Sequence, residues 1–195
     1  MLIYYNNEHY YHTWKENKMK INFNFSIAHK SQYHKESYKE HVLLVFYHAC
    51  IETEDKNIRK AAILHDIRKP ETFGLNKINE PCFYKHEEVP TEDIEKYIEE
   101  GEDINLIRAL IMCHMTPYKC LTNKNDDYKN VVMKSCAKTL KKFSIDITVD
   151  DEFYNKLMIL HQADQRGSIR TLEEYTIENQ MQAAYAFLDA AGIEI

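Results

Sequence analysis

The chain has 195 residues, which is enough for one domain with its own hydrophobic core. It contains only 4 glycines and 4 prolines, and this scarcity of turn-forming residues argues against a fold built from many strands and turns. A formal net charge of −6 argues against a broad basic surface for duplex nucleic acid. It does not exclude a phosphate substrate, because a metal site supplies positive charge locally.

The 5 cysteines predict reduced thiols. Their number is odd and no CxxC pair occurs, which argues against a disulfide framework or a zinc finger. No apolar run is long enough to cross a membrane, and the segment from Met1 to Trp14 lacks the cationic and apolar regions of a signal peptide. We therefore expect a cytoplasmic protein with no membrane partner.

The predicted elements are helices. Residues 1–20 show no periodicity and predict an N-terminal extension, which one domain over residues 21–195 follows. From about Ser37 onward, apolar residues recur at helical spacing. The fold class predicted is all-α, a single bundle of six or seven helices with no strand. The expected helices are 37–49, 54–67, 91–100, 103–115, 127–143, 150–166 and 171–191, with loops at 70–89 and 118–126.

Four residues set the expected helix boundaries. Pro70 should end the second helix, because proline disfavours helix in the residue before it. Thr91 is a predicted N-cap, with acidic residues in the first turn after it. Gly101 suits the C-cap of the same helix, and the next helix should stop before Pro117.

A histidine and an aspartate, His65 and Asp66, directly follow the apolar stretch 61–64. A carboxylate at a hydrophobic helix end is costly to bury alone, so it usually pairs or binds a metal. Imidazole and carboxylate together suit divalent metals such as Fe, Mn, Co, Ni or Zn. Each of the other histidines, taken alone, is better explained as an ordinary core or surface residue.

Five segments of the chain form a pattern when they are read together. The central one is Ala-Ala-Ile-Leu-His-Asp-Ile-Arg-Lys-Pro-Glu-Thr at 61–72, and the others are 40–42, 85–88, 113–115 and 163–167. In this order they resemble the HD-domain superfamily of metal-dependent phosphohydrolases. They are especially similar to the HD domains of bacterial tRNA nucleotidyltransferases and of related stand-alone or kinase-fused proteins. The resemblance covers about residues 30–170.

The resemblance implies a metal site that holds two divalent ions, drawn from Fe, Mn, Co, Ni, Zn and Mg. Four residues match the core ligands of the superfamily, and two match the extra histidines that hold a second ion in dinuclear members. The core set is His41, His65, Asp66 and Asp164, and the extra pair is His86 and His114.

Three further residues are candidates for substrate binding. Lys69 matches the lysine that usually lies near the substrate phosphate, and it joins Asp66 and Asp164 as a catalytic candidate. Arg68 stands where the superfamily usually has glycine, so it adds a phosphate contact or narrows the site. His34 is expected near the substrate mouth, although simple surface exposure explains it as well.

The remaining histidines are expected to be structural or exposed. His48 lies seven residues after His41, about 10 Å along a helix, and cannot share its metal. His161 shares a helical face with Asp164 and is read as core packing or as a supporting residue. The surface set is His9, His12 and His29.

The implied function is hydrolysis of a nucleotide, a cyclic phosphodiester or an RNA-end phosphate through metal-activated hydroxide. The expected partner is a small phosphoester or nucleotide, with an RNA end as a further possibility. A basic stripe would suit such an end, but a solvated helix face explains it better; the stripe comprises Lys134, Lys138, Lys141 and Lys142. Two alternatives stay open, a di-iron oxygenase of the same superfamily and a catalytically silent regulatory module.

Overall fold

The computed structural model describes residues 29, 31, 34–121, 127–169 and 174–190, so the predicted extension over residues 1–20 lies outside the described part of the chain. Helices dominate this part, which confirms the all-α class. Six of them have nine or more residues; they are α1 (Tyr38–Glu52), α2 (Lys56–Leu64), α4 (Ile104–Cys113), α6 (Tyr128–Lys142), α7 (Asp151–Gly167) and α8 (Glu174–Ala190). The short elements are strands β1 (Phe73–Leu75) and β2 (Pro81–Phe83), helices α3 (Thr91–Ile94) and α5 (Thr116–Cys120), and the 3₁₀ turn Glu95–Tyr97.

Side-chain caps fix where four of the long helices begin, α1, α2, α4 and α7. Ser37 and Glu40 form a reciprocal capping box at α1, in which each side chain accepts a hydrogen bond from the other residue's backbone N–H. Three aspartates cap α2, α4 and α7 without a reciprocal contact, each accepting from one or two backbone N–H groups that the helix itself leaves unpaired. They are Asp55, Asp103 and Asp150.

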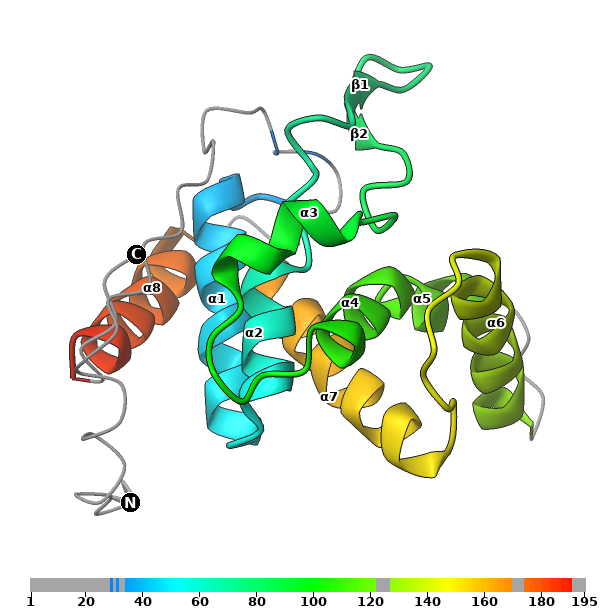
Figure 1. Ribbon diagram of the computed structural model, residues 1–195. Helices are drawn as coiled ribbons and strands as arrows, with labels where there is room; N and C mark the ends of the chain where they lie inside the picture. The colour runs from blue at the N-terminus through cyan, green and yellow to red at the C-terminus, as the bar shows by residue number, and fades with distance from the viewer. Residues whose placement is uncertain (1–28, 30, 32–33, 122–126, 170–173, 191–195) are drawn as a thin grey trace.

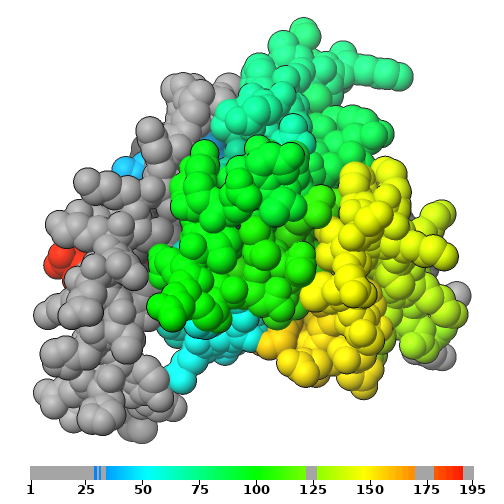
Figure 2. Space-filling model, viewed as in Figure 1, coloured from blue at the N-terminus to red at the C-terminus, as the bar shows by residue number. Residues whose placement is uncertain are grey.

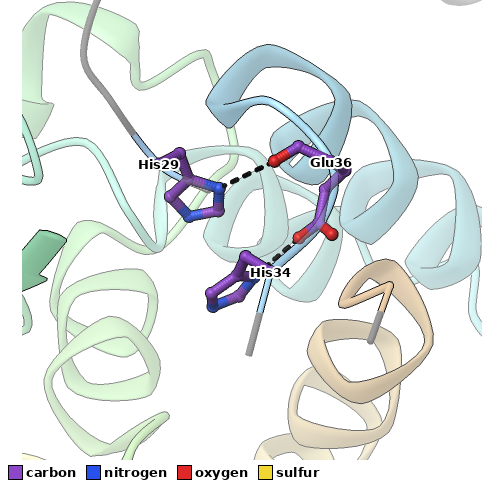
Figure 3. A group of neighbouring side chains, drawn as sticks. All are labelled: His29, His34 and Glu36. Atoms are coloured by element: carbon purple, nitrogen blue, oxygen red, sulfur yellow. Dashed lines mark hydrogen bonds and ion pairs between the residues drawn. The ribbon is translucent and has the colours of Figure 1, made fainter. Parts of the chain in front are cut away.

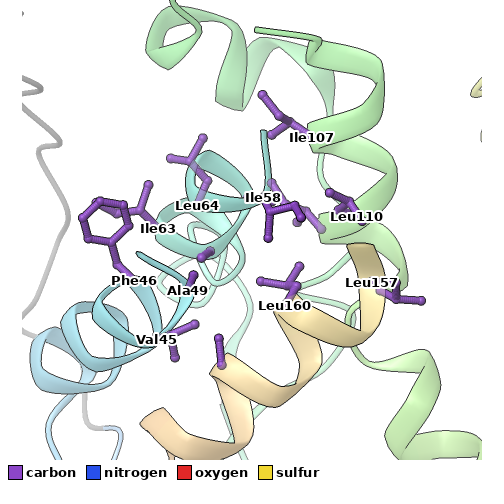
Figure 4. Packing of buried hydrophobic residues seen from close by; sticks show 14 of the residues in the cluster. Val45, Phe46, Ala49, Ile58, Ile63, Leu64, Ile107, Leu110, Leu157 and Leu160 are labelled. Carbon is purple, nitrogen blue, oxygen red and sulfur yellow. The ribbon is translucent and has the colours of Figure 1, made fainter. Parts of the chain in front are cut away.

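The core forms where α1 and α2 pack together with α4 and α7 (Figures 1 and 4). Helix α1 contacts α2, α7 and α8, while α2 also packs on α4. Helix α1 and the end of α7 approach closely, with Gly167 lying against the backbone of Val45. The side chains that meet in Figure 4 include Val45, Phe46, Ala49, Ile58, Ile63, Leu64, Ile107, Leu110, Leu157 and Leu160.

The prediction of no strand is wrong for residues 70–89. Strands β1 and β2 pair antiparallel, with Phe73 opposite Phe83, and Asn79 takes a left-handed conformation (φ 59°) in the turn between them. This hairpin forms the upper edge of the molecule in the view of Figures 1 and 2. Each strand has only three residues, too few to show an alternating pattern in the sequence.

Several predicted boundaries also differ from the structure. Thr91 is the first helical residue and not the N-cap, which is Pro90. Helix α3 ends at Ile94 and gives way to a 3₁₀ turn, so Gly101 (φ 76°) serves a later turn and not the helix end. Residues 118–120, predicted as loop, belong to α5, which carries a proline in its first turn, where the missing N–H costs nothing.

Candidate metal centre

The six predicted metal ligands come from five separate segments and lie together. His41 is in the first turns of α1, and Asp164 is near the end of α7. His65 and His114 are the C-caps of α2 and α4, and Asp66 follows His65. His86 lies in the turn after β2, directly behind Lys85, whose left-handed backbone (φ 62°) is unusual for a residue with a side chain. All six are buried: His41, His65, Asp66, His86, His114 and Asp164.

Three of them form a first ligand set, His41, His65 and Asp164. The Nε2 atoms of His41 and His65 are 3.2 Å apart, and His41 Nε2 is 3.4 Å from Asp164 Oδ1. Asp66 Oδ2 faces this set, at 3.2 Å from both imidazole nitrogens. These distances converge on one point between the four side chains, as donors around a single ion do.

Asp66, His86 and His114 form a second ligand set. The two Nε2 atoms are 3.3 Å apart, and Asp66 Oδ1 lies 3.2 Å from His86 and 4.0 Å from His114. Asp66 therefore presents one carboxylate oxygen to each set. This is the arrangement of a carboxylate that bridges two ions.

The outer nitrogens of the four imidazoles fix how the rings are presented. Each Nδ1 lies within hydrogen-bond distance of a backbone carbonyl, so that Nδ1–H donates and the Nε2 lone pair points to the centre. The acceptors are Gly167 O for His41 (3.1 Å), Ala62 O for His65 (2.7 Å), Phe83 O for His86 (2.8 Å) and Ile111 O for His114 (2.6 Å).

This donor chemistry fits divalent metals. Facing Nε2 lone pairs repel each other unless a cation or a proton lies between them. Asp66 Oδ2 is buried and accepts no hydrogen bond among the described residues, although the Lys69 ammonium lies 2.5 Å away as an ion-pair partner. The residues present therefore suit the two-ion site that the sequence predicts.

The electrostatics of the centre favour the binding of a cation. Burial alone would raise the pKa of Asp66, but His65 and Lys69 beside it hold that pKa well below the usual range. Burial likewise opposes ionisation of Asp164, and His41 and His65 lower its pKa. Burial lowers the pKa of His114 to about 3, with His86 and His65 adding to the effect, so this ring is neutral and available as a ligand.

The three predicted substrate residues occupy different places. Lys69 is buried between the carboxylate of Asp66 and His29, whose Nε2 lies 2.8 Å from its Nζ. His34 lies beside the first set, with its ring centroid 4.9 Å from that of His41. The guanidinium of Arg68 donates to the Glu88 carbonyl at 2.7 Å and lies near Asp93, so it ties down the segment before α3.

Sequence reasoning missed two residues beside the centre. His29 was predicted at the surface, and this prediction is wrong, because its side chain is buried against Lys69. Tyr38 is fully buried and donates its hydroxyl to the Asp66 carbonyl at 2.7 Å, which fixes the backbone of the bridging carboxylate. A tyrosine on the apolar face of α1 carries no sequence signal that separates this role from packing.

Two further histidines of the described residues, His161 and His48, belong to neither ligand set. His161 is buried and packs its ring against Tyr118, with centroids 4.3 Å apart, which agrees with core packing. His48 is half-buried on α1 and belongs to neither set. His9 and His12 lie outside the described residues.

Comparisons with known proteins point to one family. Residues 38–161 match the family model described as HD domain, which is more than half of the chain and stops three residues before Asp164. No curated protein and no solved structure matches the chain. Among the described residues, no helix combines the length and apolar character of a membrane span.

Proposed function

Because the chain belongs to the HD-domain family, whose members are generally metal-dependent hydrolases, we propose that it is a phosphohydrolase. Its substrate would be a nucleotide, a cyclic phosphodiester or a phosphorylated RNA end. The single observation that supports this most is the position of Asp66, whose two carboxylate oxygens face two different histidine pairs. Without this geometry, the family match would suggest the activity class but would give no residue a place in the site.

The described side chains would hold the two ions in two groups. His41, His65 and Asp164 would hold one divalent ion, His86 and His114 the other, and Asp66 both. Divalent ions held in this way supply Lewis-acid charge and lower the pKa of bound water.

Lys69 is placed to bind the phosphoryl group. Its ammonium lies beside Asp66 at the centre, so it would hold a phosphoryl oxygen there and stabilise the negative charge that develops during reaction. Burial of Lys69 and of the ligands keeps bulk water away, which strengthens this electrostatic contact.

The test is reconstitution followed by an activity screen. Protein stripped with a chelator and reloaded with Mn²⁺, Co²⁺, Ni²⁺ or Fe²⁺ should hydrolyse at least one member of a panel of nucleotides, cyclic diesters and phosphorylated oligoribonucleotides. Asp66→Asn should remove the activity, since the amide keeps the shape but not the charge that both ions need. Asp146→Asn, at an exposed carboxylate outside the centre, is the matched control and should leave it unchanged.

Two other outcomes would replace the proposal. Oxygen consumption by the iron-loaded protein, with no phosphoester hydrolysed, would favour an oxygenase that uses the same ligands. Tight metal binding with no turnover of any kind would favour a regulatory module. The presence of all six expected ligands argues against a regulatory module, and the resemblance of residues 61–72 to the HD domains of tRNA nucleotidyltransferases favours hydrolysis over oxygenation.

A further inference from the structure

A third group of polar side chains lies directly beside the first ligand set. It consists of His29, His34 and Glu36, whose ligand-type atoms come within 4.8 Å of one another (Figure 3). The ring centroids of His29 and His34 lie 5.2 Å and 4.9 Å from that of His41. This group precedes α1 in the chain. It lies beside the N-terminal end of that helix, where His41 is located.

The group is not an independent metal site, because the Glu36 carboxylate is already engaged through both oxygens. Oε2 accepts hydrogen bonds from the backbone N–H groups of Lys35 (3.0 Å) and Ile169 (2.9 Å). Oε1 accepts one from His34 Nδ1 at 2.6 Å. The Glu36 carbonyl meets His29 Nδ1 at 3.4 Å, the second contact drawn in Figure 3.

The Oε1 atom of Glu36 also lies close to a candidate metal ligand. Glu36 Oε1 lies 3.4 Å from His41 Nδ1, on the side of the ring opposite the Nε2 atom that faces the centre. The Nδ1–H of His41 is thus shared between this carboxylate and the Gly167 carbonyl at 3.1 Å. A second carboxylate, that of Glu87, lies 3.8 Å from the outer nitrogen of His86 in the second set, farther than Glu36 lies from His41.

The complete burial of Glu36 needs an explanation. An ionised carboxylate removed from water is costly unless several hydrogen bonds and charges compensate it. Glu36 has this compensation, because its oxygens accept hydrogen bonds from two backbone N–H groups and face the Nδ1 atoms of His34 and His41, a donor set that suits an ionised carboxylate. A buried negative charge behind a ligating imidazole fixes the ring and makes its other nitrogen a stronger donor to a cation.

We infer that Glu36 is a positioning residue for the first metal set. Its carboxylate holds the His41 ring from behind and strengthens the hold of that set on its ion. Through Ile169 it also joins the start of α1 to the segment just after α7, so His41 and Asp164 keep their separation. The inference rests on the metal centre of the proposed function, but not on the reaction carried out there.

The two ligand sets should therefore respond differently to the loss of this carboxylate. Glu36 touches His41 in the first set, whereas the outer nitrogens of His86 and His114 meet backbone carbonyls of Phe83 and Ile111. Removing its charge should weaken the binding of one ion about 10- to 100-fold, the range typical for residues that support a metal ligand, and leave the binding of the other ion nearly unchanged. If Glu36 only stabilised the fold, its loss would weaken metal binding at both sets to the same degree.

The experiment is a Co²⁺ titration of the stripped protein, followed by visible absorption and by competition with a chelator. In the wild type it should show two binding steps. In Glu36→Gln one step should shift to weaker affinity while the other stays, and Glu36→Asp, which keeps the charge, should recover part of the loss. The control is Glu40→Ala, which removes the capping box of the same helix without touching His41 and should shift neither step.

Each result has one meaning. Unchanged binding in Glu36→Gln, or equal weakening of both steps in Glu36→Gln and Glu40→Ala, would overturn the inference. If Glu36→Gln does not fold, the same titration of Glu36→Asp decides, since the shorter side chain should still weaken one step selectively. A wild type that binds two ions but hydrolyses nothing would refute only the proposed function, whereas a wild type that binds no ion would refute both.

Discussion

The contact between Gly167 and Val45 predicts a strong effect for one added methyl group. A Cβ at residue 167 would lie 2.5 Å from Val45 Cγ2 and 2.8 Å from Val45 N. Ordinary carbon contacts need about 3.5–4.0 Å, so α7 would have to move away from α1 by about 1 Å. Val45 is fully buried and the clash includes its backbone, so a side-chain rotation cannot relieve it.

The cost of Gly167→Ala follows from this geometry. Overpacking of this kind typically lowers the free energy of unfolding by about 1–3 kcal/mol, which corresponds to a Tm decrease of roughly 2–12 °C for a chain of this size. The displacement also separates the Gly167 carbonyl from His41 Nδ1, now 3.1 Å apart, so Co²⁺ binding at the first set should weaken as well.

Thermal unfolding followed by circular dichroism measures the first effect, and the Co²⁺ titration measures the second. The matched control is Gly74→Ala in β1, where the added Cβ would meet only ordinary contacts, the nearest being Cys82 Sγ at 3.6 Å. The reasoning is refuted if the two alanine variants unfold at the same temperature and bind Co²⁺ equally.

Three further predictions follow from charges and from metal binding. Burial raises the pKa of Asp55, but its hydrogen bond with Lys156 lowers that pKa by more, so the pKa lies below its ordinary value near 3.8. The paired carboxylate therefore stabilises the fold above this ordinary value, and it loses the effect as the pH falls through the lowered pKa. Asp55→Asn, which keeps the cap, should therefore unfold at lower temperature than the wild type at neutral pH, and the difference should shrink below about pH 4 in thermal melts. Lys60→Met leaves the buried Glu102 carboxylate without its ammonium partner and should destabilise the protein by about 3–5 kcal/mol in urea unfolding, whereas Lys60→Met combined with Glu102→Gln should recover part of that loss. Mn²⁺ at 100 times its dissociation constant should stabilise the folded protein by about 2.7 kcal/mol per site, seen as a rise in Tm that Asp66→Asn abolishes.

The sequence predicts the long helices and the grouping of the centre for identifiable reasons. Helices such as α6 and α7 carry sustained apolar periodicity, and Asp150 marks where α7 starts. His65 and Asp66 attract attention because polar residues end an apolar run, and the resemblance of the flanking segments to the HD-domain family then points to His86 and His114. These features are local in the sequence, or depend on order alone.

The parts that were missed depend on contacts between distant segments. His29 and Glu36 lie in a stretch without periodicity, and their burial follows from Lys69 and Ile169, which are 40 and 133 residues further along the chain. The hairpin was missed because its strands are too short to alternate, although it supplies the Phe83 carbonyl that orients His86. Local propensity contains none of this information.

The placement of the ligands explains how one centre assembles from segments so far apart. His65 and His114 are helix C-caps, and each ring donates its Nδ1–H to a carbonyl three residues back in its own helix, at Ala62 and Ile111. His41 lies in the first turns of α1, and its ring takes both acceptors from outside that helix, at Gly167 and Glu36. The ring at His41 therefore depends on tertiary packing more than the rings at His65 and His114 do. For this reason substitutions at residues 36 and 167 should disturb the first ligand set before the second.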